Sequence, residues 1–483
     1  MTIGLASREL PDLWQTLEHV DAVHGLYYLL MHGLFGVFGT DVIVLRLPSV
    51  LAAAAAAGGV AMIGLHLAGP RAGLCAGIVF VALPGVQRYA QEGRSYALVC
   101  ALVVWATYAL VRAVERDRRS AWTAYTALLL TACLVHEFAV LALAAHAVVV
   151  PRAMRRTFVA AAVCVVVGLA PLVLVSMRQS SQVGWLDATK PDEYAHFSLM
   201  VGVALAAVWI ATAGRRSRST ACERRLVVLG LGLFLAPTGL LMLLSLAKPL
   251  YLDRYVLYGV AGIALLLGAA FDRVLRRGHR IRAGAVVSAV IACATLVPTA
   301  LDLRTPASRS DDMTTLAAAL RETVRPDDGV VYLSVKRRAW ELAEPGRPVP
   351  GMDLARARDP LASHSLYGTE VAPGRLRARM LARHRIVVVA SPSGVTVEDS
   401  AMVRVKRDTL ADHFEACGKR TVDGSVITVY ARPGRCTGLP SPDLLPRRPM
   451  NTAPDRHPMT PSPTDRFREL RELLRAYEST GHT

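Results

Sequence analysis

The sequence predicts a polytopic α-helical membrane protein of about ten spans with a small α/β domain near its C-terminus. Three observations lead to this prediction. Of the 483 residues, 53% are apolar and only 19% are charged, whereas a soluble protein keeps roughly a quarter of its residues charged. The apolar residues form long runs up to residue 301, and from residue 302 the composition becomes mixed. These proportions exclude both a soluble globular chain and a disordered one.

A membrane span needs about 20 apolar residues, and fewer where a helix is partly buried in protein. Residues 122–135 and 137–150 are short, and they form either a hairpin or one long helix. The choice matters because it inverts the orientation of every later span. The ten candidate segments are 43–67, 74–90, 97–113, 122–135, 137–150, 157–176, 195–213, 226–247, 252–272 and 283–301.

Loop charge favours the hairpin. With a hairpin, 18 basic residues fall on one side of the membrane, mostly in clusters at 112–119, 152–156, 215–225 and 273–282, and eight fall on the other. Because cytoplasmic loops carry an excess of Lys and Arg, the richer side is cytoplasmic. The net charge of +17 is then explained by loop arginines that orient a protein of the cell membrane. Nucleic-acid binding is therefore not predicted.

Four parts follow along the chain. Residues 1–24 form an extracytoplasmic amphipathic segment on the membrane surface, without the apolar core of a signal peptide. Residues 25–301 form the multi-span domain, in which 26–38 is too short to cross. Residues 302–436 form an extracytoplasmic α/β domain, and residues 437–483 are rich in Pro, Ser and Thr and form a disordered tail.

Within residues 302–436 strand and helix patterns alternate. Helices are expected at 310–324 and 410–417, strands at 330–335 and 386–390, and a hairpin joins 420–422 to 426–431 through Asp423-Gly424, a pair favoured in two-residue turns. Cys417 and Cys436 lie near the base of this hairpin and are either a disulfide or two free thiols. The chain shows no Cys/His spacing typical of a metal site.

Five polar groups gather on the predicted outer face, where charged side chains are costly. Each has a structural alternative, such as a salt bridge closing the Glu92–Arg94 loop or anchoring of a span at the headgroups by Arg254 and Tyr255. Their joint occurrence on one face favours a functional site. The groups are Asp21/His24/Tyr27/Tyr28/His32, the segment 88–96, His136-Glu137-Phe138, the segment 178–185, and Asp253-Arg254-Tyr255.

These segments resemble the GT-C glycosyltransferases of the family 39 type, which include the protein O-mannosyltransferases and the lipid A aminoarabinose transferases. Residues 21–28 are similar to the Asp-x-His-Pro-Pro-Leu-Tyr-Tyr block, with Gly25-Leu26 in place of Pro-Pro. Residues 46–49 (Arg-Leu-Pro-Ser) and 91–98 (Gln-Glu-Gly-Arg-Ser-Tyr-Ala-Leu) resemble two further blocks. His136 and the 254–255 pair also match in order, so the resemblance covers residues 10–275.

The resemblance implies a fold, a reaction and a set of site residues. Such enzymes transfer a sugar from a polyprenyl-phosphate donor to a hydroxyl of a protein or glycan acceptor at the outer face, inverting the anomeric carbon. Neither a metal nor another cofactor is expected, and mannose is the sugar by analogy. The carboxylate candidates are Asp21 and Glu92, with His24 beside the sugar. The expected substrate contacts are Arg94 and Arg254 for phosphate, together with Tyr28, Tyr96, His136 and Tyr255.

Two other classes of function compete with this hypothesis. A transporter or flippase for lipid-linked sugars also needs a basic, aromatic cavity, but it is expected to show repeat symmetry and interrupted helices near the bilayer midplane. The sequence shows no internal repeat. A non-catalytic scaffold for envelope assembly leaves the carboxylates and arginines unexplained.

The resemblance also bears on Met1. Family members begin with a first span followed by an acidic Asp-Glu pair whose aspartate is the expected base, whereas residues 1–23 contain no apolar span. We therefore expect Met1 to be an internal methionine and the chain as given to be poorly active, unless Asp21 or Glu92 serves as the base. The in-frame codons upstream of Met1 test this expectation.

Overall fold

The computed structural model describes residues 1–179, 189–213, 221–305, 313–343, 347–391, 400–422 and 424–436. The chain divides into two units, residues 1–436 and 437–483. The second unit lies outside the described residues, so the disordered tail stays a prediction. The basic residues expected at 215–218 and most of the polar segment 178–185 also lie outside them.

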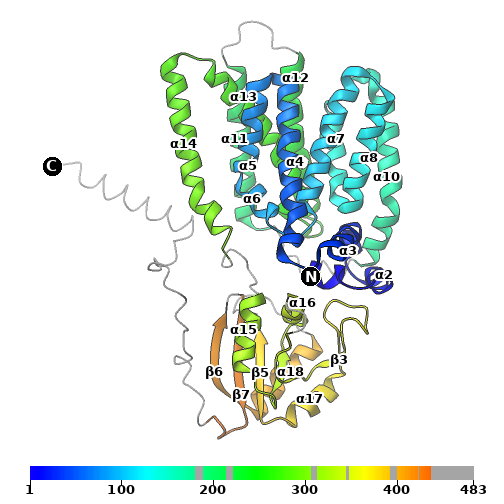
Figure 1. Ribbon diagram of the computed structural model, residues 1–483, viewed down its shortest axis with the longest axis vertical. Helices are drawn as coiled ribbons and strands as arrows, with labels where there is room; N and C mark the ends of the chain where they lie inside the picture. The colour runs from blue at the N-terminus through cyan, green and yellow to red at the C-terminus, as the bar shows by residue number, and fades with distance from the viewer. Residues whose placement is uncertain are drawn as a thin grey trace, which may run out of the picture. The chain divides into compact units, whose positions relative to one another are not determined.

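Residues 1–302 form a bundle of helices (Figure 1). The chain is a multi-pass membrane protein, because six of the described helices are long and apolar enough to cross a membrane. A further helix of 24 residues, α14 (His279–Asp302), follows them. The six are α4 (Val42–Ala68), α7 (Tyr96–Arg116), η3 and α10 (Arg152–Arg178), α11 (Pro191–Thr212), α12 (Ala221–Leu244), and η5 and α13 (Asp253–Leu275).

The expected count of ten spans is not confirmed. The segment 74–90 is two helices, α5 (Pro70–Ala82) and α6 (Pro84–Ala90), which meet at 64° and together make a seventh candidate. The helix breaks at Pro84, because proline lacks the N–H that would continue the helical hydrogen bonds. Helices α8 (Arg119–Val135) and α9 (Ala142–Ala147) have 17 and 6 residues and are not among the six candidates.

The predicted hairpin between residues 122 and 150 is confirmed by a buried polar contact. The Tyr125 hydroxyl lies 3.1 Å from His146 Nδ1, with both residues fully buried. In one continuous helix these residues would be about 30 Å apart at 1.5 Å per residue. The chain therefore turns back at His136, where α8 ends.

Three side chains join the two arms of this hairpin to α7. Thr107 donates to Val103 O at 2.8 Å, so its oxygen accepts a hydrogen bond from His146 Nε2 at 2.9 Å. His146 Nδ1 then accepts from the Tyr125 hydroxyl. The network defines a neutral imidazole that carries its proton on Nε2.

Replacing Tyr125 by phenylalanine is expected to destabilise the protein by about 1–3 kcal/mol, because it leaves His146 Nδ1 buried without a partner. Thermal unfolding in detergent measures the change. The matched control is Tyr194→Phe on α11, where the side chain is 36% exposed and little change is expected. Equal melting temperatures for the two variants would contradict the role of the network.

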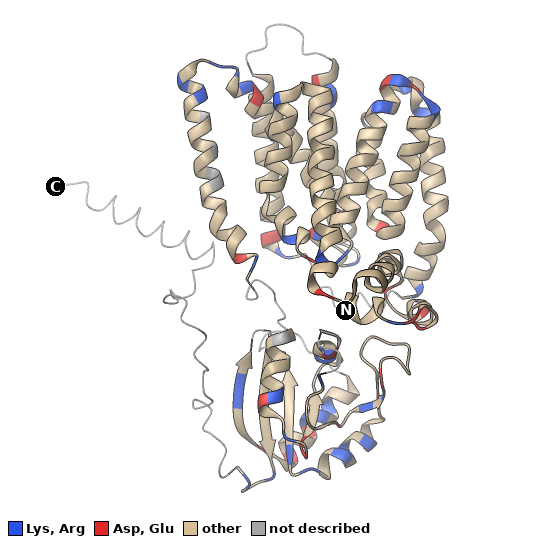
Figure 2. Ribbon diagram, viewed as in Figure 1, with Lys and Arg blue, Asp and Glu red and all other residues tan. Residues whose placement is uncertain are grey.

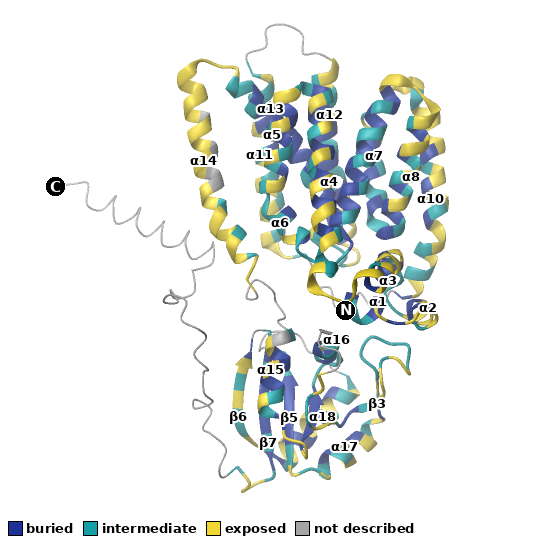
Figure 3. Ribbon diagram, in the orientation of Figure 1, coloured by how far each residue is buried: buried dark blue, intermediate teal, exposed yellow. Residues whose placement is uncertain are grey.

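Helices α7 and α13 lie at the centre of the bundle, whereas α14 is largely exposed along its length (Figure 3). Lys and Arg residues lie mainly at the ends of the helices in the bundle (Figure 2). At one end Glu115 of α7 contacts His66 of α4 and lies 3.7 Å from Arg225 of α12. The turns with the most arginines therefore share one end, as the loop charges predict.

The amphipathic segment forms two short helices, α1 (Thr2–Ala6) and α2 (Leu10–His19). Leu13 and Leu17 of the expected apolar stripe are buried against the next helix, whereas Leu10 and Trp14 are exposed. The short apolar run that follows is α3 (Gly25–Phe38), which is too short to span, as predicted.

Residues 313–436 build a five-stranded sheet in the order β2-β1-β5-β7-β6. Strands β1, β2 and β5 are parallel, and β5, β7 and β6 pair antiparallel. A two-stranded ribbon of β3 (Arg356–Arg358) and β4 (Thr369–Glu370) lies apart. The sheet strands are β1 (Gly329–Tyr332), β2 (Met352–Asp353), β5 (Arg385–Ala390), β6 (Glu415–Val422) and β7 (Ser425–Ala431). The helices are α15 (Met313–Thr323), η7 (Val335–Ala339), α16 (Trp340–Ala343), α17 (Pro373–Leu381) and α18 (Ala401–His413).

The expected helix at 410–417 was misplaced. Helix α18 ends at His413, and Phe414 has extended backbone angles that lead into β6. The reason is that Glu415–Val422 pairs with β7, so sheet pairing outweighs the local helical pattern. Cys417 of β6 forms a disulfide with Cys436, with Cα atoms 5.3 Å apart, which decides between the two alternatives.

Candidate functional site

Four segments far apart in the sequence meet at the end of the bundle opposite the arginine-rich turns. They are η1 (Ala22–His24) with the start of α3, the loop between α6 and α7, the turn after α8, and η5 (Asp253–Gly259). Ring contacts, hydrogen bonds and ion pairs between them bring together the predicted site residues. Glu92 belongs to the same group, because Arg88, Arg254 and Arg94 all lie close enough to lower the pKa of its carboxyl against the larger opposite effect of burial.

Asp21, Tyr28 and Arg94 form the polar centre. The Tyr28 hydroxyl donates to Asp21 Oδ2 and accepts from Arg94 Nη1 at 3.2 Å. Arg94 Nη1 also lies 3.8 Å from Asp21 Oδ2. Tyr28 itself is fully buried, so it holds the carboxylate and the guanidinium in fixed positions.

The backbone at Asp21 is left-handed, with φ of 58°, a conformation that aspartate tolerates better than most residues. Gln179, just after α10, stabilises this backbone conformation through contacts with the residues on either side of Asp21. Its Oε1 accepts from Ala22 N at 3.0 Å, and its Nε2 donates to Leu17 O at 2.8 Å. The sequence analysis included Gln179 within the polar segment 178–185 but gave it no role, because a neutral polar residue in a polar loop carries no pattern of its own.

An aromatic and imidazole cluster adjoins this centre. The rings of His24 and His136 lie 5.3 Å apart, and those of His136 and Tyr255 4.7 Å apart. Tyr96 lies 5.8 Å from His136 and 6.2 Å from Tyr255. His24 Nδ1 lies 3.1 Å from the hydroxyl of Ser95, a second residue that the sequence analysis did not single out.

Arg254 caps the aromatic cluster. Its guanidinium lies 5.6 Å from the Tyr96 ring centre and 5.7 Å from that of Tyr255, within cation–π range. Two buried nitrogens here, Arg254 Nε and His136 Nδ1, have no hydrogen-bond partner among the described residues. Because buried polar atoms are rarely left unpaired, this pair indicates a place for a polar ligand.

The loop that carries Glu92 and Arg94 is tied to α4. The Ser49 hydroxyl lies 2.6 Å from Glu92 O and 3.2 Å from Arg94 O. The Glu92 carboxylate itself lies 4.0 Å from Arg88 Nε.

Burial sets the protonation of the site. It raises the pKa of Asp21 despite the opposing effect of Arg94 and of the Tyr28 hydrogen bond. It also raises the pKa of Glu92 against the nearby Arg88. Burial, with added repulsion from Arg94 and Arg254, lowers the pKa of His24 to about 3, so this imidazole is neutral.

Among the described residues, the group with metal-ligand spacing is Glu415, Cys417 and Cys436. Both of its thiols are joined in the disulfide, so this group does not offer a metal site. The expectation that the protein needs no cofactor stays a prediction.

No protein-family model and no curated protein matches the chain. Among solved structures, ArnT from Cupriavidus metallidurans in the apo state matches with a TM-score of 0.52 and 13% identity, over 88% of this chain and 93% of that one. ArnT bound to undecaprenyl phosphate matches at 0.46 and 12%, over 86% and 88%. The apo oligosaccharyltransferase of Archaeoglobus fulgidus matches at 0.48 and 11%, over 76% and 61%.

The likeness to apo ArnT establishes the class of fold. The chain has a fold similar to that of ArnT, in line with the resemblance in its sequence. At this level of identity the likeness concerns the fold alone. The chemistry has to be argued from the site.

Proposed function

We propose that the chain is a membrane glycosyltransferase, which transfers a sugar from a polyprenyl-phosphate donor to an acceptor hydroxyl with inversion. A mannose-type hexose is the first donor to test, on the basis of the family resemblance. The observation that carries the proposal is the juxtaposition of the Asp21–Tyr28–Arg94 centre with Arg254 Nε and His136 Nδ1, two buried nitrogens that have no hydrogen-bond partner among the described residues. A carboxylate and two guanidinium groups beside a cluster of aromatic and imidazole rings match the requirements of this reaction.

The first requirement is a base. When an acceptor oxygen attacks the anomeric carbon, its proton must pass to a neighbouring group. Asp21 fills this role better than Glu92, because Tyr28 and Arg94 hold its carboxylate in place, while Glu92 lies beside Arg88. The raised pKa of Asp21 makes its carboxylate a stronger base than an exposed aspartate.

The second requirement is stabilisation of the leaving group. Negative charge grows on the lipid phosphate as the glycosidic bond breaks, and fixed guanidinium groups stabilise it without reorganisation. Arg254 has a buried Nε without a partner among the described residues, so a phosphate oxygen can accept from it. Arg94 is the second cation. Its forked geometry also suits phosphate.

The third requirement is a surface for the sugar ring. His24, Tyr96, His136 and Tyr255 form a cluster of aromatic and imidazole rings, and Arg254 lies against it. Neutral His24 offers one donor and one acceptor nitrogen, which suits sugar hydroxyls. The lipid tail is expected to lie against the apolar helices of the bundle.

We also propose the orientation. The arginine-rich turns mark the cytoplasmic end, which puts the site and residues 302–436 on the extracytoplasmic side. The Cys417–Cys436 disulfide supports this assignment, because disulfides persist in oxidising compartments.

A donor-consumption assay tests the proposed reaction. The full chain in proteoliposomes is supplied with a polyprenyl-phosphate sugar labelled in both the sugar and the lipid. Transfer is expected to release free polyprenyl phosphate in step with glycosylated acceptor. Movement of intact donor across the bilayer without release would instead establish the rival transport function and overturn the proposal.

A further inference from the structure

The α/β part of the chain contains a second candidate site, beside the edge strand β2. Two neighbouring cavities of about 580 and 400 Å³ share Gly351, Asp353 and Arg356, and the two together are called the trough below. We propose that this trough binds a neutral saccharide. The saccharide is part of the acceptor, an assignment that rests on the proposed function.

The lining of the trough combines opposite charges in equal number. Three carboxylates and three guanidinium groups line it, so the formal charge of the lining is zero while hydrogen-bond donors and acceptors are abundant. A polyanion or polycation gains little from such a surface, whereas a polyhydroxylated ligand pairs with both kinds of group. The six charged residues are Glu341, Asp353, Asp359, Arg347, Arg356 and Arg358.

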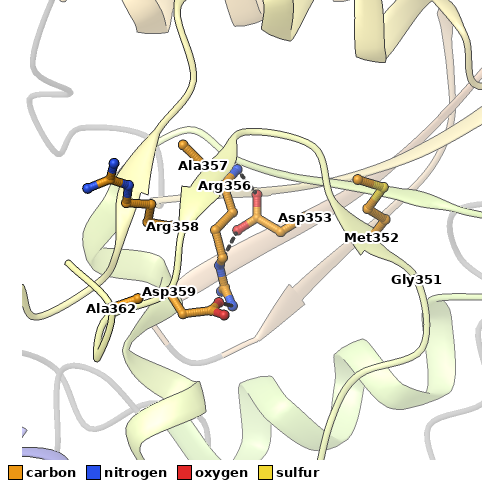
Figure 4. A pocket seen from close by; sticks show the side chains of 8 residues that line it. All are labelled: Gly351, Met352, Asp353, Arg356, Ala357, Arg358, Asp359 and Ala362. Carbon is orange, nitrogen blue, oxygen red and sulfur yellow. Dashed lines mark hydrogen bonds and ion pairs between the residues drawn. The ribbon is translucent and has the colours of Figure 1, made fainter.

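Arg356 forms ion pairs with all three carboxylates of the trough. Figure 4 shows its side chain extended between Asp353 and Asp359, with Arg358 pointing away from them. Its Nη1 donates to Asp359 at 3.3 Å, its Nη2 to Glu341, and its Nε lies 3.5 Å from Asp353 Oδ2. The carboxylate oxygens are therefore held in fixed positions, which reduces the entropic cost of binding.

A network of buried charged side chains holds Asp353 in place. Arg338, whose side chain is 0% exposed, donates to Asp353 at 2.6 Å and to Glu370 at 3.0 Å. Lys406 adds a bond of 2.8 Å to Glu370. Arg338 Nη1 still has no hydrogen-bond partner among the described residues. Buried ion pairs seldom stabilise more than apolar residues of the same volume, so this network is better explained as support for a polar binding surface.

One wall of the trough continues into the loop 359–368, which contacts the N-terminal segment. Arg8 donates through Nη2 to Ser365 O at 2.8 Å and through Nη1 to the Thr16 hydroxyl at 2.6 Å. Leu366 packs against the buried cluster that contains Tyr28. The trough is thus linked by direct contacts to the segment that positions Asp21.

The test is direct binding to the full chain in nanodiscs. The probes are neutral hexasaccharides of mannose, glucose, galactose and arabinose, with a hyaluronan hexasaccharide as the anionic probe. At least one neutral probe is expected to bind and the anionic probe is not. The double variant Arg358→Ala/Asp359→Ala, at exposed positions of the trough, is expected to weaken that binding at least about tenfold, because each lost group removes hydrogen bonds to the saccharide.

Two controls separate this proposal from the proposed function. Arg375→Ala/Arg377→Ala changes two exposed arginines of α17 outside the trough and is expected to bind like the wild type. Asp21→Asn is expected to bind the saccharide normally while failing to transfer sugar. The proposal is overturned if no neutral probe binds, if only hyaluronan binds, or if binding survives in the trough variant. If transfer is absent from the wild type and saccharide still binds, the failure lies with the proposed function.

Discussion

Replacing Arg94 by alanine is expected to lower the rate of sugar transfer by at least about 10²–10³-fold, the range found when one preorganised charge-stabilising donor is removed. Arg94 contacts Tyr28 and lies 3.8 Å from Asp21, so the variant loses both a cation for the phosphate and a group that holds the carboxylate. Release of polyprenyl phosphate from the labelled donor measures the rate.

The protein is expected to remain folded in the membrane, because the Arg94 side chain is 28% exposed and sits in a loop. Arg94→Lys keeps the charge without the fork and is expected to recover part of the activity. Arg375→Ala, far along the chain on α17, is the matched control. Transfer by Arg94→Ala at the wild-type rate would remove Arg94 from the mechanism.

Replacing Asp21 by asparagine is expected to lower the rate by about 10²–10⁴-fold, the usual contribution of a positioned general base. Glu92→Gln, the matched change at the other carboxylate, is expected to have a much smaller effect, because Tyr28 and Arg94 hold the carboxylate of Asp21, whereas the ion pair described for Glu92 is the 4.0 Å contact with Arg88. Initial rates of the two variants under saturating donor decide between the carboxylates. A larger loss in Glu92→Gln would transfer the role of base to Glu92.

The dependence on pH follows from the raised pKa of Asp21. A base acts only when ionised, so the rate should fall as pH is lowered through this pKa. The fall should begin at a higher pH than for an ordinary aspartate, since burial favours the protonated form. The residual activity of Asp21→Asn should lack this acidic limb, and an unchanged profile in that variant would contradict the assignment.

The membrane part of the fold is predictable where charge and hydrophobicity agree. Loop arginines selected the hairpin at 122–150, and the Tyr125–His146 contact confirms it. The break between α5 and α6 follows from Pro84, a signal that a span-length criterion ignores. The end of α18 was not predictable from local pattern, because the partner strand β7 decides where β6 begins.

The candidate site was also predictable only in part. Charged and aromatic residues at a membrane face are conspicuous, and Asp21, Arg94, His136 and Arg254 were found on that basis. The residues that position them are neutral and common, as with Gln179 and Ser95, and only the folded chain reveals their contacts. The same holds for Arg338, whose burial nothing in its sequence neighbourhood indicates.

The most direct test of the central claim is a structure of the full chain in nanodiscs with polyprenyl phosphate. The account predicts that the phosphate lies within hydrogen-bond distance of Arg254 Nε, beside the rings of Tyr96 and Tyr255, with Arg94 on its other side. A phosphate bound instead among the arginine-rich turns at the opposite end of the bundle would contradict the account.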